Sequence, residues 1–282
     1  MPLHSYTTFS KSNQRLIFLL VASHMVWACA LFGFWSTGRL FETSSLLWSG
    51  FYLAFQLYAA AQLLLPALLI HPENRNRGFY LFWATVLIFS VWLLHQLSPT
   101  TSWQPLLDSF QSALLLLVAT VTGAAMARYI NKLWEIIPVC LVMTLADFAS
   151  WLYGPTAGFT QAIQQYYQAP SGPAPMVDMI LVKLAFPGAS GLLPAFGVSD
   201  WIMVVFFAIV AARHEVNDNL LGTSGEEQAV RGKIGCYLPV SVVALFLAMA
   251  LAQTTGLFIP ALPVIALVMM LWYSLRYLFL RL

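Results

Sequence analysis

The sequence contains very little charge for its length. Only 9% of its 282 residues are charged, whereas a soluble globular domain carries about 25%. Hydrophobic residues make up 60% of the chain, and the mean hydropathy is +0.77. A chain of this composition cannot cover a water-facing surface, so it indicates an integral membrane protein surrounded by lipid. The net charge of +2 is too small to indicate a nucleic-acid partner.

Cysteine is also scarce and widely spaced. Cys29, Cys140 and Cys236 each lie in an apolar stretch, and no two of them form a Cys-x-x-Cys pair. This spacing indicates neither a zinc site nor a disulfide framework. We therefore interpret the three cysteines as small apolar residues and expect no metal and no cofactor.

Long apolar runs dominate the remainder of the chain. A membrane-spanning helix needs about 20 mostly apolar residues. The sequence predicts an all-α polytopic membrane protein with eight such helices: 15–36, 45–70, 78–97, 105–127, 133–153, 190–213, 234–256 and 259–280. We divide it into an N-terminal four-helix part, 1–130, and a C-terminal catalytic part, 131–282. The pair Gly123-x-x-x-Ala127 predicts a close approach between two helices.

The basic residues divide unevenly between the two sides of the predicted bundle. Only Arg39 and Lys183 fall on one side when eight helices alternate in direction. Eleven fall on the other side: Lys11, Arg15, Arg75, Arg77, Arg128, Lys132, Arg213, Arg231, Lys233, Arg276 and Arg281. By the positive-inside rule, both termini are expected in the cytoplasm and the connection 154–190 on the outer face.

Two aspartates interrupt apolar helices. Asp108 lies near the start of its helix and is expected to reach the headgroups, but Asp147 and Asp200 lie deeper. A charge at the centre of a bilayer costs about 2.5–3.5 kcal/mol on the insertion scale. Asp147 follows Lys132 by 15 residues and Asp200 precedes Arg213 by 13, which places them roughly 22 Å and 20 Å from the same membrane edge. We expect consecutive antiparallel helices to bring them side by side.

Two facing carboxyl groups in a medium of low dielectric titrate as a unit. Such a pair can hydrolyse a peptide bond, as in aspartic proteases, or relay protons in a transporter. Separate structural roles also remain open. Asp200 would suit a helix N-cap, and Asp147 could bond across the bundle to a neighbouring helix.

A proline-rich element is expected at the same height. Pro260-Ala261-Leu262-Pro263 precedes Arg276 by 16 residues at its first proline, or roughly 24 Å of helix. The prolines could simply begin the last helix. They would also leave backbone groups unpaired, which is tolerated at this depth only beside protein or a water-filled cavity.

The set of elements resembles the presenilin and signal peptide peptidase family of intramembrane aspartyl proteases. The matching features are Asp147 in "LADFASWLYGPTAGFTQAIQQ", Gly197-x-x-Asp200 opening the next helix, and Pro-Ala-Leu-Pro opening the last. The resemblance covers about 138–263 and implies that Asp147 and Asp200 are the catalytic pair. It further implies substrate-binding roles for a second set: Gly197, Ser199, Pro260, Ala261 and Leu262.

Some features depart from the family pattern. Ser199 stands where the family has a second glycine, and Ala146 where it usually has tyrosine. The family usually has nine helices, whereas eight are predicted here. The connection between the two aspartate-bearing helices, 154–190, is expected on the outer face, and this orientation resembles that of the signal peptide peptidase branch. In the family, a strand before the second aspartate pairs with the unwound substrate, and here 180–186 or 192–196 could form it. We therefore interpret the chain as a divergent, prokaryotic member of an inner or plasma membrane.

These observations leave three functions open. The leading hypothesis is a protease that cleaves single-span membrane proteins or signal peptides through Asp147 and Asp200. A proton-coupled transporter could use the same pair as a relay, although no internal repeat of the kind common in transporters is evident. A catalytically inactive presenilin-like scaffold is the third possibility, because of Ser199 and Ala146. The sequence predicts no oligomeric state.

Overall fold

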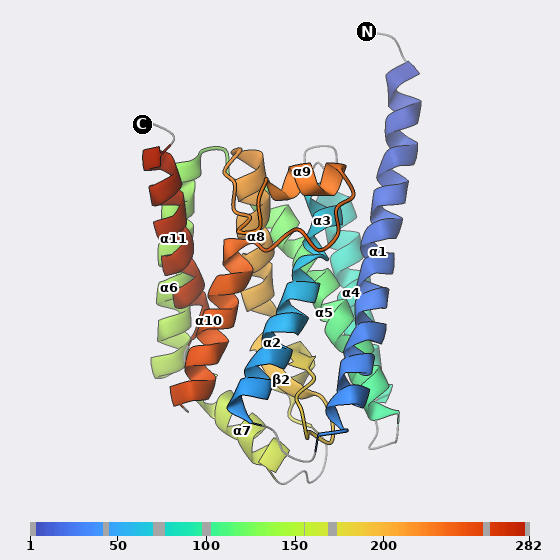
Figure 1. Ribbon diagram of the computed structural model, residues 1–282, viewed down its shortest axis with the longest axis vertical. Coiled ribbons are helices and arrows are strands. Elements are labelled where there is room, and N and C mark those ends of the chain that lie inside the picture. Colours follow the sequence, from blue (N-terminus) through green and yellow to red (C-terminus); the bar gives the residue numbers. More distant parts are fainter. Residues whose placement is uncertain are drawn as a thin grey trace.

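The structure is a computed structural model that describes residues 4–41, 45–69, 77–97, 103–154, 156–168, 174–255 and 260–279. It is mostly helical, with a small two-stranded sheet at one end (Figure 1). The elements of the N-terminal part are α1 (His4–Gly38), α2 (Leu46–Ala61), α3 (Leu64–Leu68), α4 (Arg77–Leu97) and α5 (Gln104–Ala127). Those of the C-terminal part are η2 (Leu133–Glu135), α6 (Ile136–Tyr153), α7 (Thr156–Gln168), η3 (Met176–Ile180), β1 (Leu181–Leu184), β2 (Leu193–Gly197), α8 (Val198–Arg213), α9 (Gly225–Val230), α10 (Val240–Thr255) and α11 (Ala261–Phe279).

Most of the long helices are apolar along most of their length. Among the described residues, five helical segments are long and apolar enough to cross a membrane: Arg15–Gly38, Leu46–Leu68, Arg77–Gln96, Gln104–Ala127 and Leu133–Tyr153. The apolar helices α10 and α11 are shorter. Large side chains on outward faces are also apolar, such as Phe82, which is 62% exposed, and Leu145, which is 64% exposed. Such surfaces are compatible with insertion into a bilayer.

All eight predicted helices correspond to helical segments, but several bounds differ. The predicted helix 190–213 begins only at Val198, because the five residues before it form strand β2. The predicted helix 234–256 begins at Val240, after Pro239 pairs with Asn219 in an isolated bridge. The second predicted helix is divided into α2 and α3.

A short helix was missed in the predicted polar connection. α7 follows α6 after a break at Gly154, whose φ of −105° and ψ of −172° are extended. A Cβ on Gly154 would lie 2.7 Å from the Ser150 carbonyl oxygen, so a larger residue could not end α6 in this way without a shift of the backbone.

α5 is the central helix and packs against α1, α4 and α8. It approaches α8 closely at Gly123, where a Cβ would lie 2.6 Å from the Ile202 carbonyl oxygen and 2.8 Å from Cβ of Val205. The close contact predicted from Gly123-x-x-x-Ala127 is therefore confirmed. The main hydrophobic core includes residues of α1, α2, α5, α8, α10 and α11, so the two predicted parts of the chain share one core.

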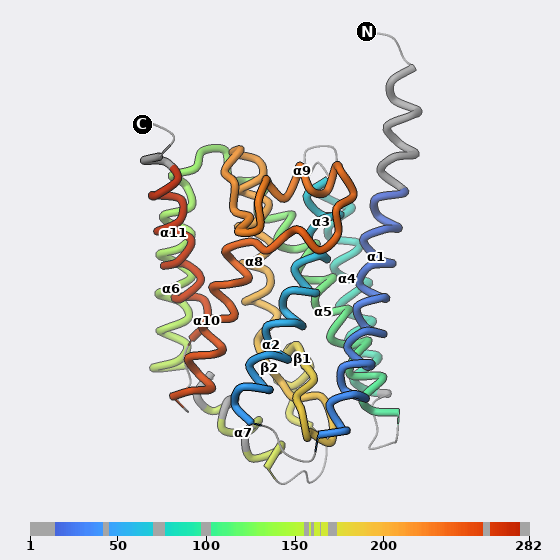
Figure 2. The backbone as a smooth tube through the Cα atoms, viewed as in Figure 1, coloured from blue at the N-terminus to red at the C-terminus, as the bar shows by residue number. Residues whose placement is uncertain are grey.

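The small sheet is held in place by side chains from the N-terminal helices. β1 and β2 pair antiparallel, with Leu181 opposite Gly197 and Leu184 opposite Leu193. Gln56 of α2 donates to the Ala185 carbonyl oxygen at 2.8 Å and accepts from the Ala185 N–H at 2.9 Å. Figure 2 shows the hairpin lying near the lower part of α2. The prediction of a strand before Asp200 is confirmed, and both candidate segments contribute to it.

A buried ion cluster fixes the same strand to α5. The Lys183 ammonium donates to Asp108 Oδ1 at 3.0 Å and lies 2.7 Å from Asp178 Oδ2. Lys183 and Asp108 are each only 4% exposed. The expectation that Asp108 reaches the headgroups is therefore wrong, because its carboxylate turns inward to a buried cation. The Tyr167 hydroxyl of α7 donates to Asp178 Oδ1 at 2.9 Å, so the cluster also anchors α7.

The bundle has two distinct ends (Figure 1). At the terminal end, α1 begins and α8 and α11 finish; at the hairpin end lie the β1–β2 hairpin and α7. Among the described basic residues, only Arg39 and Lys183 belong to the hairpin end, as the alternation of eight helices predicted. Because Lys183 is buried in an ion cluster, Arg39 is the one exposed cation that the described residues place there.

Candidate active site

Asp200 lies in the first turn of α8, directly after β2. Its Oδ2 accepts a hydrogen bond from the Gly197 N–H at 2.9 Å, and Gly197 is the N-cap residue of the helix. Asp200 therefore occupies the N3 position of a capping box, three residues after the N-cap, and is not the N-cap itself. A Cβ on Gly197 would lie 3.5 Å from Asp200 Oδ2 and 3.3 Å from Ser199 Oγ. Glycine therefore leaves the carboxyl group room at this turn.

Asp147 lies on α6, and its carboxyl group meets the beginning of α11. The Leu262 backbone N–H lies near this carboxyl group and interacts favourably with its negative form. Pro260 and Pro263 have no N–H, so Ala261 and Leu262 supply the free donors at this helix end. The N-terminus of a helix carries a partial positive charge, which favours an ionised carboxylate beside it. The proline element therefore begins the last helix and also leaves a free backbone donor, the Leu262 N–H, near Asp147.

The two carboxyl groups are close enough for an electrostatic interaction between them. α11 links their helices, because it packs against both α6 and α8. The expectation that α6 and α8 themselves lie side by side is wrong: α6 packs mainly on α11, and any direct contact with α8 is slight. The structure nevertheless brings together Asp147, Asp200 and Leu262, the three elements that the sequence placed at one height.

The residues around the pair are accessible to different degrees. Asp147 and Asp200 are half-buried, and so are Pro260, Ala261 and Leu262. Half-burial suits a site that must admit both water and a substrate. The two positions that depart from the family pattern, Ser199 and Ala146, are exposed. Neither side chain lies in the interior of the bundle, where a change of size would disturb packing.

A metal centre is not evident in the described part of the chain. No group of three or more His, Cys, Asp or Glu side chains lies close enough there to hold an ion. The chemistry available at the Asp147–Asp200 pair is that of two carboxyl groups near backbone N–H donors.

A further buried carboxyl group, outside both this pair and the ion cluster, lies at the terminal end. Asp218, in the connection between α8 and α9, is 2% exposed and accepts a hydrogen bond from the Tyr237 hydroxyl at 3.2 Å. Burial raises the pKa of Asp218 to about 7, while the Tyr237 hydroxyl acts in the opposite direction. Asp218 lies outside every helix that the sequence predicts, and nothing in its local sequence indicates that it is buried.

Sequence analysis also missed the residues that support the site. Lys183, Asp108 and Asp178 fix β1, and Gln56 and Ser112 bond to the backbone at its outer edge. A usable signal was present: Lys183 and Asp108 are opposite charges in apolar segments near the same end. Each would be costly alone in an apolar environment, so their pairing could have been expected.

Comparisons of the chain with protein families, with characterised proteins and with solved structures find no match. The residues and their geometry are therefore the basis for assigning a chemistry to the site.

Proposed function

We propose that this chain is an integral membrane aspartyl protease of the presenilin and signal peptide peptidase type, with Asp147 and Asp200 as its catalytic pair. The observation that carries the proposal is the meeting of three distant segments. The helix that Pro-Ala-Leu-Pro opens, α11, packs against both α6, which carries Asp147, and α8, which carries Asp200. The two carboxyl groups are also close enough to interact electrostatically. Unrelated structural roles for the two aspartates would not require that they and the Pro-Ala-Leu-Pro element converge.

The chemistry follows from two carboxyl groups that share one proton. The ionised member removes a proton from water, and the resulting nucleophile attacks the scissile carbonyl carbon while the protonated member donates to the carbonyl oxygen. The Leu262 N–H stabilises a negative charge on Asp147, and the Gly197 N–H does the same for Asp200. No metal ion and no covalent intermediate are required.

The β1–β2 hairpin could bind a substrate in an extended conformation. The outer edge of β1 is already engaged, because the Lys183 N–H donates to Ser112 Oγ at 3.0 Å and Ala185 bonds to Gln56. A substrate strand would therefore add to β2, which leads directly into Asp200. Backbone pairing of this kind tolerates many sequences and keeps the peptide bond extended for attack. Membrane-spanning segments and signal peptides fit such a site once they unwind.

Membrane insertion is part of the proposal. Five apolar helical segments of spanning length and the apolar outward faces of α4 and α6 support it. The concentration of cations at the terminal end supports an orientation with that end in the cytoplasm. The Asp147–Asp200 pair would then open toward the outer leaflet.

The test is cleavage of a generic single-span substrate by purified protein in detergent and in lipid vesicles. Asp147→Asn and Asp200→Asn should each reduce the cleavage rate by about 10²–10⁴-fold, the usual contribution of a general acid or base. Asp218→Asn replaces a buried carboxyl group at the opposite end and should leave the rate unchanged. The melting temperature of each variant reports whether it still folds.

The other candidate functions predict different outcomes. Normal cleavage by both variants of the pair would refute the proposal. Absence of cleavage in the wild-type protein, together with Asp200-dependent solute uptake in vesicles, would indicate a transporter. A folded protein that binds membrane segments without cleaving them would indicate a scaffold.

A further inference from the structure

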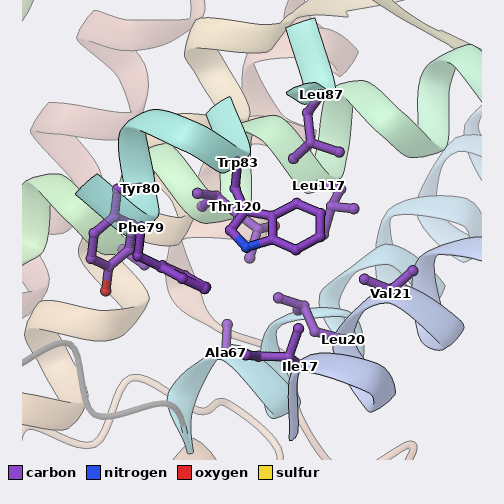
Figure 3. A pocket seen from close by; sticks show the side chains of 12 residues that line it. Ile17, Leu20, Val21, Ala67, Phe79, Tyr80, Trp83, Leu87, Leu117 and Thr120 are labelled. Atoms are coloured by element: carbon purple, nitrogen blue, oxygen red, sulfur yellow. The ribbon is translucent and has the colours of Figure 1, made fainter. Parts of the chain in front are cut away.

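A groove separates α1 from α4 on the side of the bundle away from the candidate active site. Both helices pack on α5, but they make little contact with each other. The space between them has an empty volume of about 580 Å³, part of it open to the surroundings. We refer to it as the α1/α4 groove; its lining includes Leu20, Val21, Trp83, Leu87, Leu117 and Val121. Figure 3 shows the Trp83 indole in this space, with Leu20, Val21 and Leu117 around it.

The lining of the groove calls for an apolar occupant. Nearly all of the side chains that form it are aliphatic or aromatic. Thr120 also lines it, but its hydroxyl donates to the Leu116 carbonyl oxygen of its own helix at 2.8 Å. Thr120 is therefore already satisfied and does not require a polar ligand.

One end of the groove is positively charged. Residues of α1, α3, α4 and α5 line the groove. Three of these helices have an arginine at the terminal end of the bundle: Arg15 in α1, Arg77 at the first position of α4, and Arg128 directly after α5. The Arg128 guanidinium lies over the ring of Tyr80, another residue of the groove lining, 5.3 Å from its centre. The ion pairs between described residues involve none of these three arginines.

The length of the groove matches one leaflet of a membrane. The α4 residues that line it extend to Leu87, ten positions beyond Arg77, or about 15 Å of helix. The hydrocarbon core of a bilayer is about 30 Å thick. An acyl chain that starts at the arginines would therefore end near the inner limit of the groove.

We propose that the α1/α4 groove binds one acyl chain of an anionic phospholipid in the leaflet of the terminal end, with its phosphate at Arg15, Arg77 and Arg128. The chain fills the space around Trp83, and the headgroup neutralises cations that have no acidic partner among the described residues. Such a lipid would connect α4 to α1, which the protein itself does only weakly. The inference is independent of the protease chemistry, because the groove shares no residue with the Asp147–Asp200 site.

Fluorescence quenching tests the proposal directly. The protein is reconstituted in phosphatidylcholine vesicles that contain a small fraction of phosphatidylglycerol with brominated acyl chains. Quenching of Trp83 is obtained from the difference between wild type and Trp83→Phe. Trp92, on the exposed face of the same helix, serves as the matched control through Trp92→Phe. Trp83 should be quenched several-fold more by brominated phosphatidylglycerol than by brominated phosphatidylcholine at the same fraction, whereas Trp92 should respond equally to both.

A second experiment removes one of the three arginines. Arg128→Gln should weaken the preference for the anionic lipid about fivefold, the usual effect of one basic residue near a charged headgroup. Arg276→Gln is the control, because Arg276 also lies over an aromatic ring, that of Trp272, at the same end but outside the groove. If Trp83→Phe does not fold, the preference for the anionic lipid can be measured without tryptophan variants. Native mass spectrometry then counts the phosphatidylglycerol adducts on each arginine variant.

Three results would overturn the proposal. Equal quenching of Trp83 by both brominated lipids would show that charge plays no part. Failure of either lipid to quench Trp83 would show that no acyl chain enters, as when a helix of another protein fills the groove. An equal loss of adducts in Arg128→Gln and Arg276→Gln would show that the arginines act only through general attraction to the membrane surface.

Discussion

Replacing Lys183 with methionine should strongly destabilise the protein. The ammonium lies between two buried carboxylates, at 3.0 Å from Asp108 Oδ1 and 2.7 Å from Asp178 Oδ2. Although burial alone would lower the pKa of Lys183, these carboxylates outweigh that effect and raise the pKa above its ordinary value. Methionine fills a similar volume but leaves two negative groups without their cation.

The expected loss can be estimated from buried ion pairs in general. Removing one partner of such a pair costs about 3–5 kcal/mol. On the scale of roughly 2–4 °C per kcal/mol for proteins of 150–250 residues, the melting temperature in detergent should fall by roughly 10 °C. Arg39→Met is the matched control at the same end, because Arg39 is exposed. Its loss should stay below about 1 kcal/mol.

A double variant separates electrostatics from packing. Lys183→Met combined with Asp108→Asn removes one positive and one negative charge, so only Asp178, still bonded to Tyr167, remains buried and charged. This double variant should melt at a higher temperature than Lys183→Met alone. The view that the ion cluster holds β1 in place would be refuted if the stability losses of Lys183→Met and Asp108→Asn simply added in the double variant. It would also be refuted if Lys183→Met were as stable as Arg39→Met.

Two further predictions concern packing and titration. Gly123→Ala should cost about 1–3 kcal/mol because its Cβ would meet the α8 backbone, whereas Gly33→Ala, which has no atom within 4 Å of the added Cβ, should not lower the melting temperature. Burial raises the pKa of Asp218 to about 7, so between about pH 4 and pH 7 the folded state binds more protons than the unfolded state. Stability should therefore fall as the pH rises through this window, by up to about 4 kcal/mol. The melting temperature of Asp218→Asn minus that of wild type should therefore be more positive at pH 8 than at pH 5. The same difference at both pH values would contradict this prediction.

The helices were predictable because long apolar runs leave few alternatives in a membrane. The predicted segments 78–97, 105–127 and 133–153 lie within a few residues of the observed helical segments. Their ends were less certain because local chemistry decides them. The sixth predicted helix started too early, since 193–197 is apolar enough for a helix but pairs with β1 instead.

For the candidate site, the sequence predicted a common height for three elements but not how their helices pack. Counting residues from the basic ends placed Asp147, Asp200 and the Pro-Ala-Leu-Pro element at one height, and in the structure they converge. Chain order suggested that α6 and α8 would touch, but α11 lies against both. Tertiary contacts of this kind depend on the shapes of the helix faces, which the spacing of polar residues does not encode.

Binding of a transition-state analogue tests the central claim most directly, because the hydroxyl group of such an analogue must contact both carboxyl groups at once. A photoreactive hydroxyl-containing analogue of aspartyl protease substrates should label the wild-type protein and Asp218→Asn equally. Labelling should disappear in Asp147→Asn and in Asp200→Asn while both variants remain folded. Labelling that persists in both variants, or that is absent from the folded wild-type protein, would contradict a shared catalytic pair.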